Sequence, residues 1–253
     1  MPLTAQVIFG QRAAWYTTSA AHTDKAVLDR VVALARPRPD ALALDVATGT
    51  GHTAFALAPH IRRVIATDIT PEMLSEGRKL NAELGMKNVQ FHEADAHDLP
   101  FDNDTFDIVT CRRAAHHFTD IERVLREMRR VLKRGGRLVI DDRSVPEDDF
   151  VDATMNDLDR LHDASHVREY RPSQWERMLA EAGFAVEAIG PYTKHRPLSS
   201  LTTNVDLENT ARIHAVIASL NESQRAALNV VVKDGEIYTN HWFVMAMGVK
   251  RET

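Results

Sequence analysis

The sequence predicts an α/β fold in which a mainly parallel sheet carries helices on both faces. Between residues 24 and 141, short apolar runs alternate with helical patterns of about 10–15 residues, which is typical of right-handed crossovers between parallel strands. Acidic residues lie at the ends of most of these runs, and the last run of the chain, residues 237–250, has no helix after it. We therefore expect that last strand to pair antiparallel.

The first half of the chain supplies five strands and four helices. Thr23 and Asp24 can cap a helix that runs to about Ala35, where prolines end it. Buried strands are predicted at residues 41–47, 63–68, 89–95, 106–111 and 137–142. Between them, helices are expected through Phe55, Leu57 and Ala58, from Pro71 to a stop at Gly85, and over residues 121–132, closed by Gly135 and Gly136.

The second half is less regular. Residues 147–164 form an acidic helical pattern, and residues 173–182 predict a helix capped by Ser173 and ended by Gly183. A sixth strand is expected at 184–190, followed by helices at about 205–219 and 222–231 and by the final strand. We expect the helices of residues 205–231 to form part of a small lid.

Composition and charge exclude several classes of protein. The chain has 253 residues, of which 44% are hydrophobic and 26% charged, and this argues against wholesale disorder. A net charge of −5 does not favour non-specific electrostatic binding to nucleic acid. No apolar run approaches about 20 residues, so no membrane span is expected. Residues 1–15 lack the charged start and apolar block of a secretory signal.

The cysteine content points to a reducing compartment. Cys111 is the single cysteine, so neither an internal disulfide nor a zinc site built mainly from thiolates can form. We expect a cytoplasmic protein.

The loop after the first strand is the first candidate site. Parallel sheets bind ligands beyond the C-terminal ends of their strands, and Asp45-Val-Ala-Thr-Gly-Thr-Gly51 lies at such an end. Glycines there let backbone amides approach a ligand closely, although a tight turn can also serve packing alone. The dinucleotide fingerprint would need glycines at Ala47 and His52, so this loop departs from it.

Two further strands end in acids. Asp68 follows the second strand and can accept hydrogen bonds from ribose hydroxyls. Asp95 and Ala96 follow the third, where a carboxylate and a backbone amide can bind an adenine edge. Each acid alone is typical of a turn, but three at successive strand ends indicate a nucleoside site.

These motifs resemble those of class I S-adenosylmethionine-dependent methyltransferases. Within that superfamily the chain is similar to the ubiquinone/menaquinone-biosynthesis-type small-molecule methyltransferases. The resemblance covers residues 40–142 and rests on residues 45–51, Thr67-Asp68, Asp95-Ala96, Leu99-Pro100-Phe101, Phe106-Asp107 and residues 129–136. It implies a Rossmann-like, seven-stranded sheet. As a single methyltransferase domain over 1–253, the chain would have a core at about 24–145 and substrate-side insertions at about 146–182 and 195–233.

The resemblance also implies roles for individual residues. S-adenosylmethionine would be the cofactor, with no metal, and the partner would be a small-molecule acceptor rather than a nucleic acid. Asp45 would organise the loop, Asp68 would hold the ribose, and Asp95 would bind the adenine edge. The other cofactor contacts would come from Tyr16, Ala47, Gly49, Gly51, Ile69, Met73, Ala96 and Arg112, where Ala47 replaces a frequent glycine and Tyr16 could reach the cofactor carboxylate.

The substrate side is expected beyond the fourth strand. A sulfonium is already a good leaving group, so the protein need only align the acceptor, exclude water and remove a proton where necessary. His116 is our candidate base, and its neighbour His117 a substrate contact, although either can simply cap or face solvent. Arg112 or Arg113 can bind an anionic substrate or pair with Asp141 or Asp142, and we expect Arg113 to contact the substrate.

A second polar cluster lies in residues 163–171. His166, Arg168 and Tyr170 could hold a polar or anionic acceptor, or the segment could be a surface loop. An NAD-dependent oxidoreductase, a nucleic-acid methyltransferase and a non-catalytic S-adenosylmethionine-binding protein are the alternatives. The first lacks a Tyr-x-x-x-Lys pair, and the second lacks the expected motif after the fourth strand.

Overall fold

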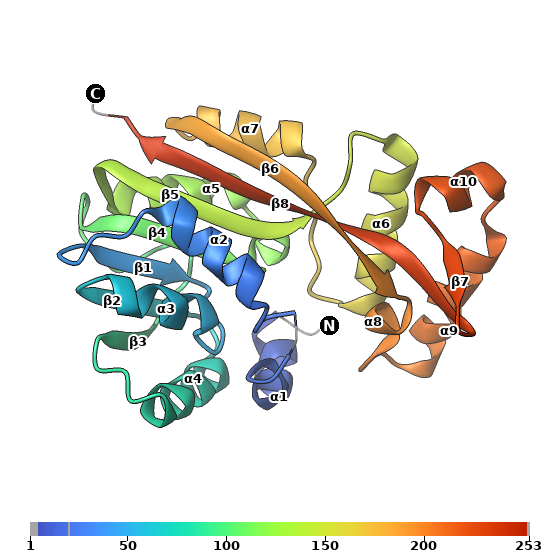
Figure 1. Ribbon diagram of the computed structural model, residues 1–253, viewed down its shortest axis with the longest axis horizontal. Helices are drawn as coiled ribbons and strands as arrows, with labels where there is room; N and C mark the ends of the chain where they lie inside the picture. The colour runs from blue at the N-terminus through green and yellow to red at the C-terminus, as the bar shows by residue number, and fades with distance from the viewer. Residues whose placement is uncertain (1–4, 20, 252–253) are drawn as a thin grey trace.

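The computed structural model describes residues 5–19 and 21–251 (Figure 1). The first four residues of the segment searched for a secretory signal therefore lie outside the described residues. The strands are β1 Leu42–Val46, β2 Arg63–Asp68, β3 Val89–Glu93, β4 Phe106–Arg112, β5 Leu132–Ser144, β6 Phe184–Pro197, β7 Val231–Lys233 and β8 Glu236–Lys250.

Helices connect these strands. They are α1 Ala5–Tyr16, α2 Lys25–Ala35, α3 His52–Leu57, α4 Pro71–Glu83, α5 Ile121–Val131, α6 Asp149–His162, α7 Pro172–Glu181, α8 Ser199–Thr202, α9 Leu207–Ser219 and α10 Glu222–Ala227. Two short 3-10 turns add residues Ala58–His60 and Ala115–His117.

The predicted α/β architecture is confirmed. The strand order is β3-β2-β1-β4-β5-β8-β6, with β7 beside β8. Strands β1 to β5 are parallel, and β8 pairs antiparallel with both β5 and β6, as expected for the last strand. The chain order reverses between β1 and β4, so the C-terminal ends of these two strands flank the switch point where ligands bind.

Two apolar cores lie on opposite faces of the sheet. One contains buried residues of α2, α3 and α4, such as Val31, Phe55 and Leu74. The other contains residues of α5 and α7, such as Leu125 and Trp175. A sheet with both faces covered explains why its central strands are almost continuously apolar.

A third core lies away from this sheet. Buried residues of α6, α8 and α9, with Leu228 just after α10, pack together with the first half of β8, and Figure 1 shows β6 and β8 running from the main sheet to these helices. The segment 146–182, which we expected to be one insertion, therefore contributes to two cores. Helix α6 belongs to the third core, whereas Trp175 of α7 is buried in the core that α5 and α7 form on the sheet.

Several boundaries differ from the expectations. Helix α5 ends at Val131 and passes directly into β5, so Gly135 and Gly136 lie inside the strand rather than closing the helix. The N-cap of α7 is Arg171, while Ser173 binds Glu147. Strand β6 continues to Pro197, and α1, α8 and β7 had not been predicted. Among the described residues, no helix is long and apolar enough to cross a membrane.

Candidate active site

The loop after β1 is organised by a buried carboxylate. Asp45 accepts hydrogen bonds from the hydroxyls of Thr110 at 2.6 Å and Thr48 at 2.5 Å. Burial raises the pKa of Asp45 to about 6, against the opposing effect of these hydrogen bonds. The carboxylate of Asp45 thus links Thr48 of the loop to Thr110 of β4.

The two glycines of this loop do different things. Gly49 has a φ of +56° and open space where a side chain would be, and it lines a cavity. Gly51 has a φ of +96°, and a Cβ there would lie 2.8 Å from Phe91 and 2.9 Å from Phe55. Gly51 does not line the cavity, so the structure places it in helix–sheet packing rather than against the methionine portion of a cofactor. Ala47 lines the cavity with a φ of +51°, a conformation that glycine adopts more easily.

Asp68 is the last residue of β2, and two backbone N–H groups hold its carboxylate. Its Oδ2 accepts the backbone N–H of Gly49 at 2.9 Å, and its Oδ1 accepts that of Thr70 at 2.9 Å. Burial raises the pKa of this carboxyl. Each oxygen keeps a second lone pair, so the carboxylate can also accept hydrogen bonds from a ligand in the cavity.

The third strand end adds an acidic and apolar wall. Asp95 accepts hydrogen bonds on Oδ1 from the backbone N–H of His97 at 2.9 Å and from the His97 ring at 2.7 Å. Ala96 and Met73 are buried beside it, whereas Ile69 remains 43% exposed although it lines the cavity. An exposed isoleucine over a polar rim is a suitable surface for a flat aromatic group.

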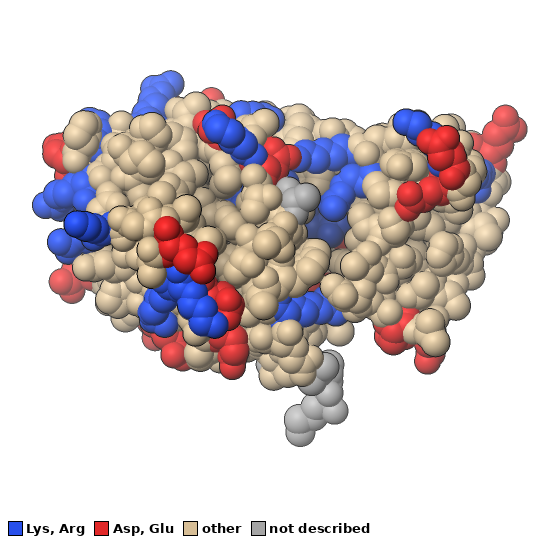
Figure 2. Space-filling model, turned by 60° about the horizontal axis from the view of Figure 1, so that its bottom comes forward, with Lys and Arg blue, Asp and Glu red and all other residues tan. Residues whose placement is uncertain are grey.

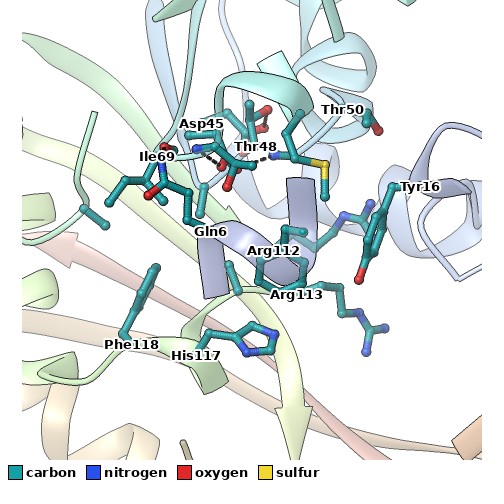
Figure 3. Close-up of a pocket in the computed structure, with 18 of the residues that line it drawn as sticks. Gln6, Tyr16, Asp45, Thr48, Thr50, Ile69, Arg112, Arg113, His117 and Phe118 are labelled. Carbon is teal, nitrogen blue, oxygen red and sulfur yellow. Dashed lines mark hydrogen bonds between the residues drawn. The ribbon is translucent and has the colours of Figure 1, made fainter. Parts of the chain in front are cut away.

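These strand ends meet in one cavity of 430 Å³, within the range of about 300–1,000 Å³ that is usual for small-molecule sites. Figure 3 shows Asp45 and Thr48 on one side of it and His117 and Phe118 on the other. Every predicted cofactor residue except Gly51 lines this first cavity, including Tyr16 of α1.

Arg112 places an unpaired charge at the first cavity. Its Nε donates to Thr53 Oγ1 at 2.9 Å and its Nη2 to the carbonyl of His22 at 2.7 Å. Its Nη1 is buried without a partner among the described residues. A buried guanidinium nitrogen with no acceptor is costly unless a ligand supplies one, so Arg112 is suited to a carboxylate.

A second cavity of 430 Å³ adjoins the first. Five residues line both, namely Phe9, Tyr16, His22, Arg113 and His117. Arg113 pairs with Asp141 at 3.2 Å, and its guanidinium stacks 3.9 Å from the ring centroid of Phe243. Its φ of +57° is an unfavourable backbone conformation for an arginine, and such conformations concentrate at functional sites.

The two adjacent histidines are held differently. His116 lines only the second cavity, and its Nδ1 lies 2.6 Å from Asp142 Oδ1. Burial lowers the pKa of His116 well below its usual value, so the ring is neutral and Nδ1–H donates to the carboxylate. His117 lines both cavities, with Nδ1 3.0 Å from Ser165 Oγ.

The cluster at residues 163–171 reaches the second cavity only in part. His166 lines it, with Nε2 3.0 Å from Asn156 Oδ1. Arg168 forms an ion pair with Asp152 at 2.8 Å, and Tyr170 packs on Trp175; neither lines a cavity. Their assignment to the substrate is therefore corrected, because both side chains are used in fixing α6 and α7.

Strand β6 contributes to the second cavity beyond the end predicted for it from the sequence. Tyr192, Lys194 and Arg196 alternate along β6, and Lys194 and Arg196 line the cavity. Two cations spaced two residues apart, as on one face of a strand, are present in the sequence at residues 194 and 196. They lie beyond the predicted end of the sixth strand at residue 190.

The chain is similar to known proteins in sequence and in fold. A methyltransferase domain family matches residues 44–140. An uncharacterized methyltransferase of Bacillus subtilis, YcgJ, is 38% identical over 187 residues, which are 74% of this chain and 74% of that protein. The chain belongs to the class I S-adenosylmethionine-dependent methyltransferases. Membership of this family decides against the NAD-dependent oxidoreductase.

Other members extend the comparison. The crystal structure of YcgJ matches with a TM-score of 0.84 at 33% identity, covering 89% of this methyltransferase and 98% of that chain. The ubiquinone/menaquinone biosynthesis C-methyltransferase UbiE of Idiomarina loihiensis is 39% identical over 119 residues, or 46% of each chain. The resemblance to UbiE-type enzymes is thus confirmed, while the partial match does not transfer their acceptor.

Proposed function

We propose that this methyltransferase transfers the methyl group of S-adenosylmethionine to a small-molecule acceptor by direct in-line displacement. The proposal rests on two cavities of 430 Å³ each that share a wall. A donor in the first cavity and an acceptor in the second would meet beside Tyr16, Arg113 and His117. In the same proposal the chain is one domain over residues 1–253, with the third core as the outer wall of the acceptor cavity.

The residues of the first cavity fit the cofactor. The unpartnered Nη1 of Arg112 would donate to the methionine carboxylate, and Asp68 would accept the ribose hydroxyls. The open space above Gly49 would receive the amino-acid portion, because any side chain there would fill it. Asp95, Ala96, Ile69 and Met73 would surround the adenine.

When bound, S-adenosylmethionine supplies a methyl group on a sulfonium, which retains the bonding electron pair when the carbon–sulfur bond breaks. The protein must hold the acceptor in line with that bond and keep water out. Orientation of this kind can contribute about 7–11 kcal/mol. Because the sulfonium needs no further activation, we propose a reaction without a metal.

We assign proton removal to His116. Its Nδ1–H donates to Asp142, and its Nε2 has no hydrogen-bond partner among the described residues, so a lone pair is available on the acceptor side. Asp142 would be a positioning residue that fixes this tautomer. His117 is the competing base, since it lines the shared wall.

Binding of two ligands tests the cofactor orientation. S-adenosylhomocysteine carries the amino-acid portion, and 5′-methylthioadenosine lacks it. We expect Arg112→Gln to weaken calorimetric binding of S-adenosylhomocysteine by about tenfold or more, since the lost bond is charge-assisted. Binding of methylthioadenosine should stay within threefold, and thermal unfolding must show a folded variant. Equal losses for both ligands would contradict the carboxylate assignment.

Turnover tests the base. This test needs an acceptor, which is identified because methyl transfer to it releases S-adenosylhomocysteine. With that acceptor, His116→Gln should lower kcat by about 10²–10⁴-fold, the usual contribution of general base catalysis. Asp142→Asn should also lower kcat, while cofactor affinity stays near wild type in both variants. If only His117→Gln lowers kcat, the base is His117 instead.

A further inference from the structure

Lysine and arginine side chains of α1, the loop after β4, β5 and β6 line the second cavity. Figure 2 shows Lys and Arg side chains around the hollow near the middle of this face. The lining residues of this kind are Arg12, Arg113, Arg143, Lys194 and Arg196. A hollow lined by one sign of charge concentrates ligands of the opposite charge.

Three of these cations are already neutralised. Arg143 forms ion pairs with Asp159 at 2.8 Å and with Glu169 at 2.6 Å. Lys194 pairs with Asp24 of the α2 N-terminus, and Arg113 with Asp141. These three side chains shape the cavity without leaving a full charge for a ligand.

Arg196 has no such partner among the described residues. It is half-buried on β6, and its guanidinium makes no hydrogen bond or ion pair with any residue in 5–19 or 21–251. Burial and the charges of Arg143 and Arg113 lower the pKa of Arg196, and the smaller opposing effect of Asp159 does not cancel them, so its positive charge is only partly compensated. Arg12, from α1, also has no carboxylate partner in the described chain and donates only to the carbonyl of Asn204 at 2.8 Å.

The acids of this cavity do not neutralise Arg196. Asp159 is paired with Arg143. Asp163 accepts hydrogen bonds from the backbone N–H of Ser165 at 2.8 Å and from its hydroxyl at 2.6 Å. The remaining walls include the aromatic rings of Phe9, Trp15 and Phe243.

We propose that the second cavity takes an acceptor with an apolar body and one anionic group, a carboxylate or a phosphate, which Arg196 binds. The aromatic walls would hold the body and present its methyl-accepting atom at the wall shared with the first cavity. This inference rests on the proposed function and adds the chemical class of the acceptor and the residue that selects it.

Matched probes test the charge requirement. In calorimetric titrations of the protein saturated with S-adenosylhomocysteine, we expect 2-naphthoate to bind at least about tenfold more tightly than its neutral isostere 2-naphthamide. Titration with 2-naphthyl phosphate shows which anion is preferred. Arg196→Gln should remove the preference, Arg196→Lys should retain most of it, and Arg212→Gln, on the exposed face of α9, should leave it unchanged.

The outcomes separate the two proposals. If S-adenosylhomocysteine itself does not bind, the proposed function fails. If it binds but naphthoate and naphthamide bind equally, or neither binds, the anionic acceptor is overturned while the cofactor assignment stands. Retention of the full preference in a folded Arg196→Gln variant would also overturn the role of Arg196.

Discussion

Replacement of Asp68 by alanine is the sharpest test of the cofactor site. Asp68 lines the first cavity, and its two oxygens accept the N–H groups of Gly49 and Thr70, each at 2.9 Å, so each oxygen keeps one lone pair. A hydrogen bond to a charged group contributes about 1.5–3 kcal/mol. Loss of two ribose bonds should therefore cost about 3 kcal/mol or more, which weakens S-adenosylhomocysteine binding about 100-fold.

Two further variants separate ligand contact from loop damage. Asp68→Asn keeps one carbonyl oxygen, so we expect a loss of only about tenfold. Asp98→Ala removes the same charge from an exposed position near the end of β3, and it should change the affinity by less than threefold. Isothermal titration calorimetry measures all three, at a temperature where thermal unfolding shows each variant folded. A folded Asp68→Ala variant whose affinity lies within threefold of wild type would refute the ribose assignment.

Three other predictions concern the loop after β1. Ala47→Gly should stabilise the protein by about 0.5 kcal/mol in urea unfolding, because relief of about 1–2 kcal/mol of left-handed strain is partly offset by about 0.4–1 kcal/mol of chain entropy. A less stable variant would contradict this reasoning. Gly51→Ala should cost about 3 kcal/mol, from the same strain plus overpacking against Phe91, whereas Gly49→Ala should cost about 1–2 kcal/mol but weaken S-adenosylhomocysteine binding. The reverse order of stabilities would refute the different roles of these glycines. Burial raises the pKa of Asp45 to about 6 in the folded protein. Its unfolded value is near 3.9, so this contribution to stability is complete at low pH and is lost as pH rises through about 6. At about 1.36 kcal/mol per pKa unit, the unfolding free energy of Asp45→Asn minus that of wild type should rise by about 3 kcal/mol between acid and neutral pH. A pH-independent difference in unfolding free energy would exclude the raised pKa.

Local patterns predicted the elements that carry the cofactor site. Apolar runs followed by acids placed β1 and β2 close to their observed bounds, because buried parallel strands need continuous apolar residues. Edge strand β3, in which only Val89 and Phe91 are buried, was also placed close to its observed bounds. Asp45, Asp68 and Asp95 then had to share one edge, since parallel strands end on the same side of a sheet. The Asp-Gly turn between β7 and β8, with φ values of +52° and +80°, was an available hairpin signal that had not been used.

The acceptor side was much less predictable. Arg168 and Tyr170 were reasonable substrate contacts by residue type, but Arg168 pairs with Asp152 of α6 and Tyr170 packs on Trp175 of α7. Arg196 was missed because β6 runs past its expected end. Helix α1 had not been recognised either, although it supplies Phe9, Arg12 and Tyr16 to the cavities.

The sequence by itself determined the family, the parallel sheet and the carboxylates on its rim, because these follow from the order and spacing of residues close together along the chain. Only the tertiary structure decided which charged groups remain without a partner. An ion pair depends on which distant segments fold against each other, and no local pattern reveals that Arg143, Lys194 and Arg113 are matched while Arg112 and Arg196 have no carboxylate partner in the described part of the chain.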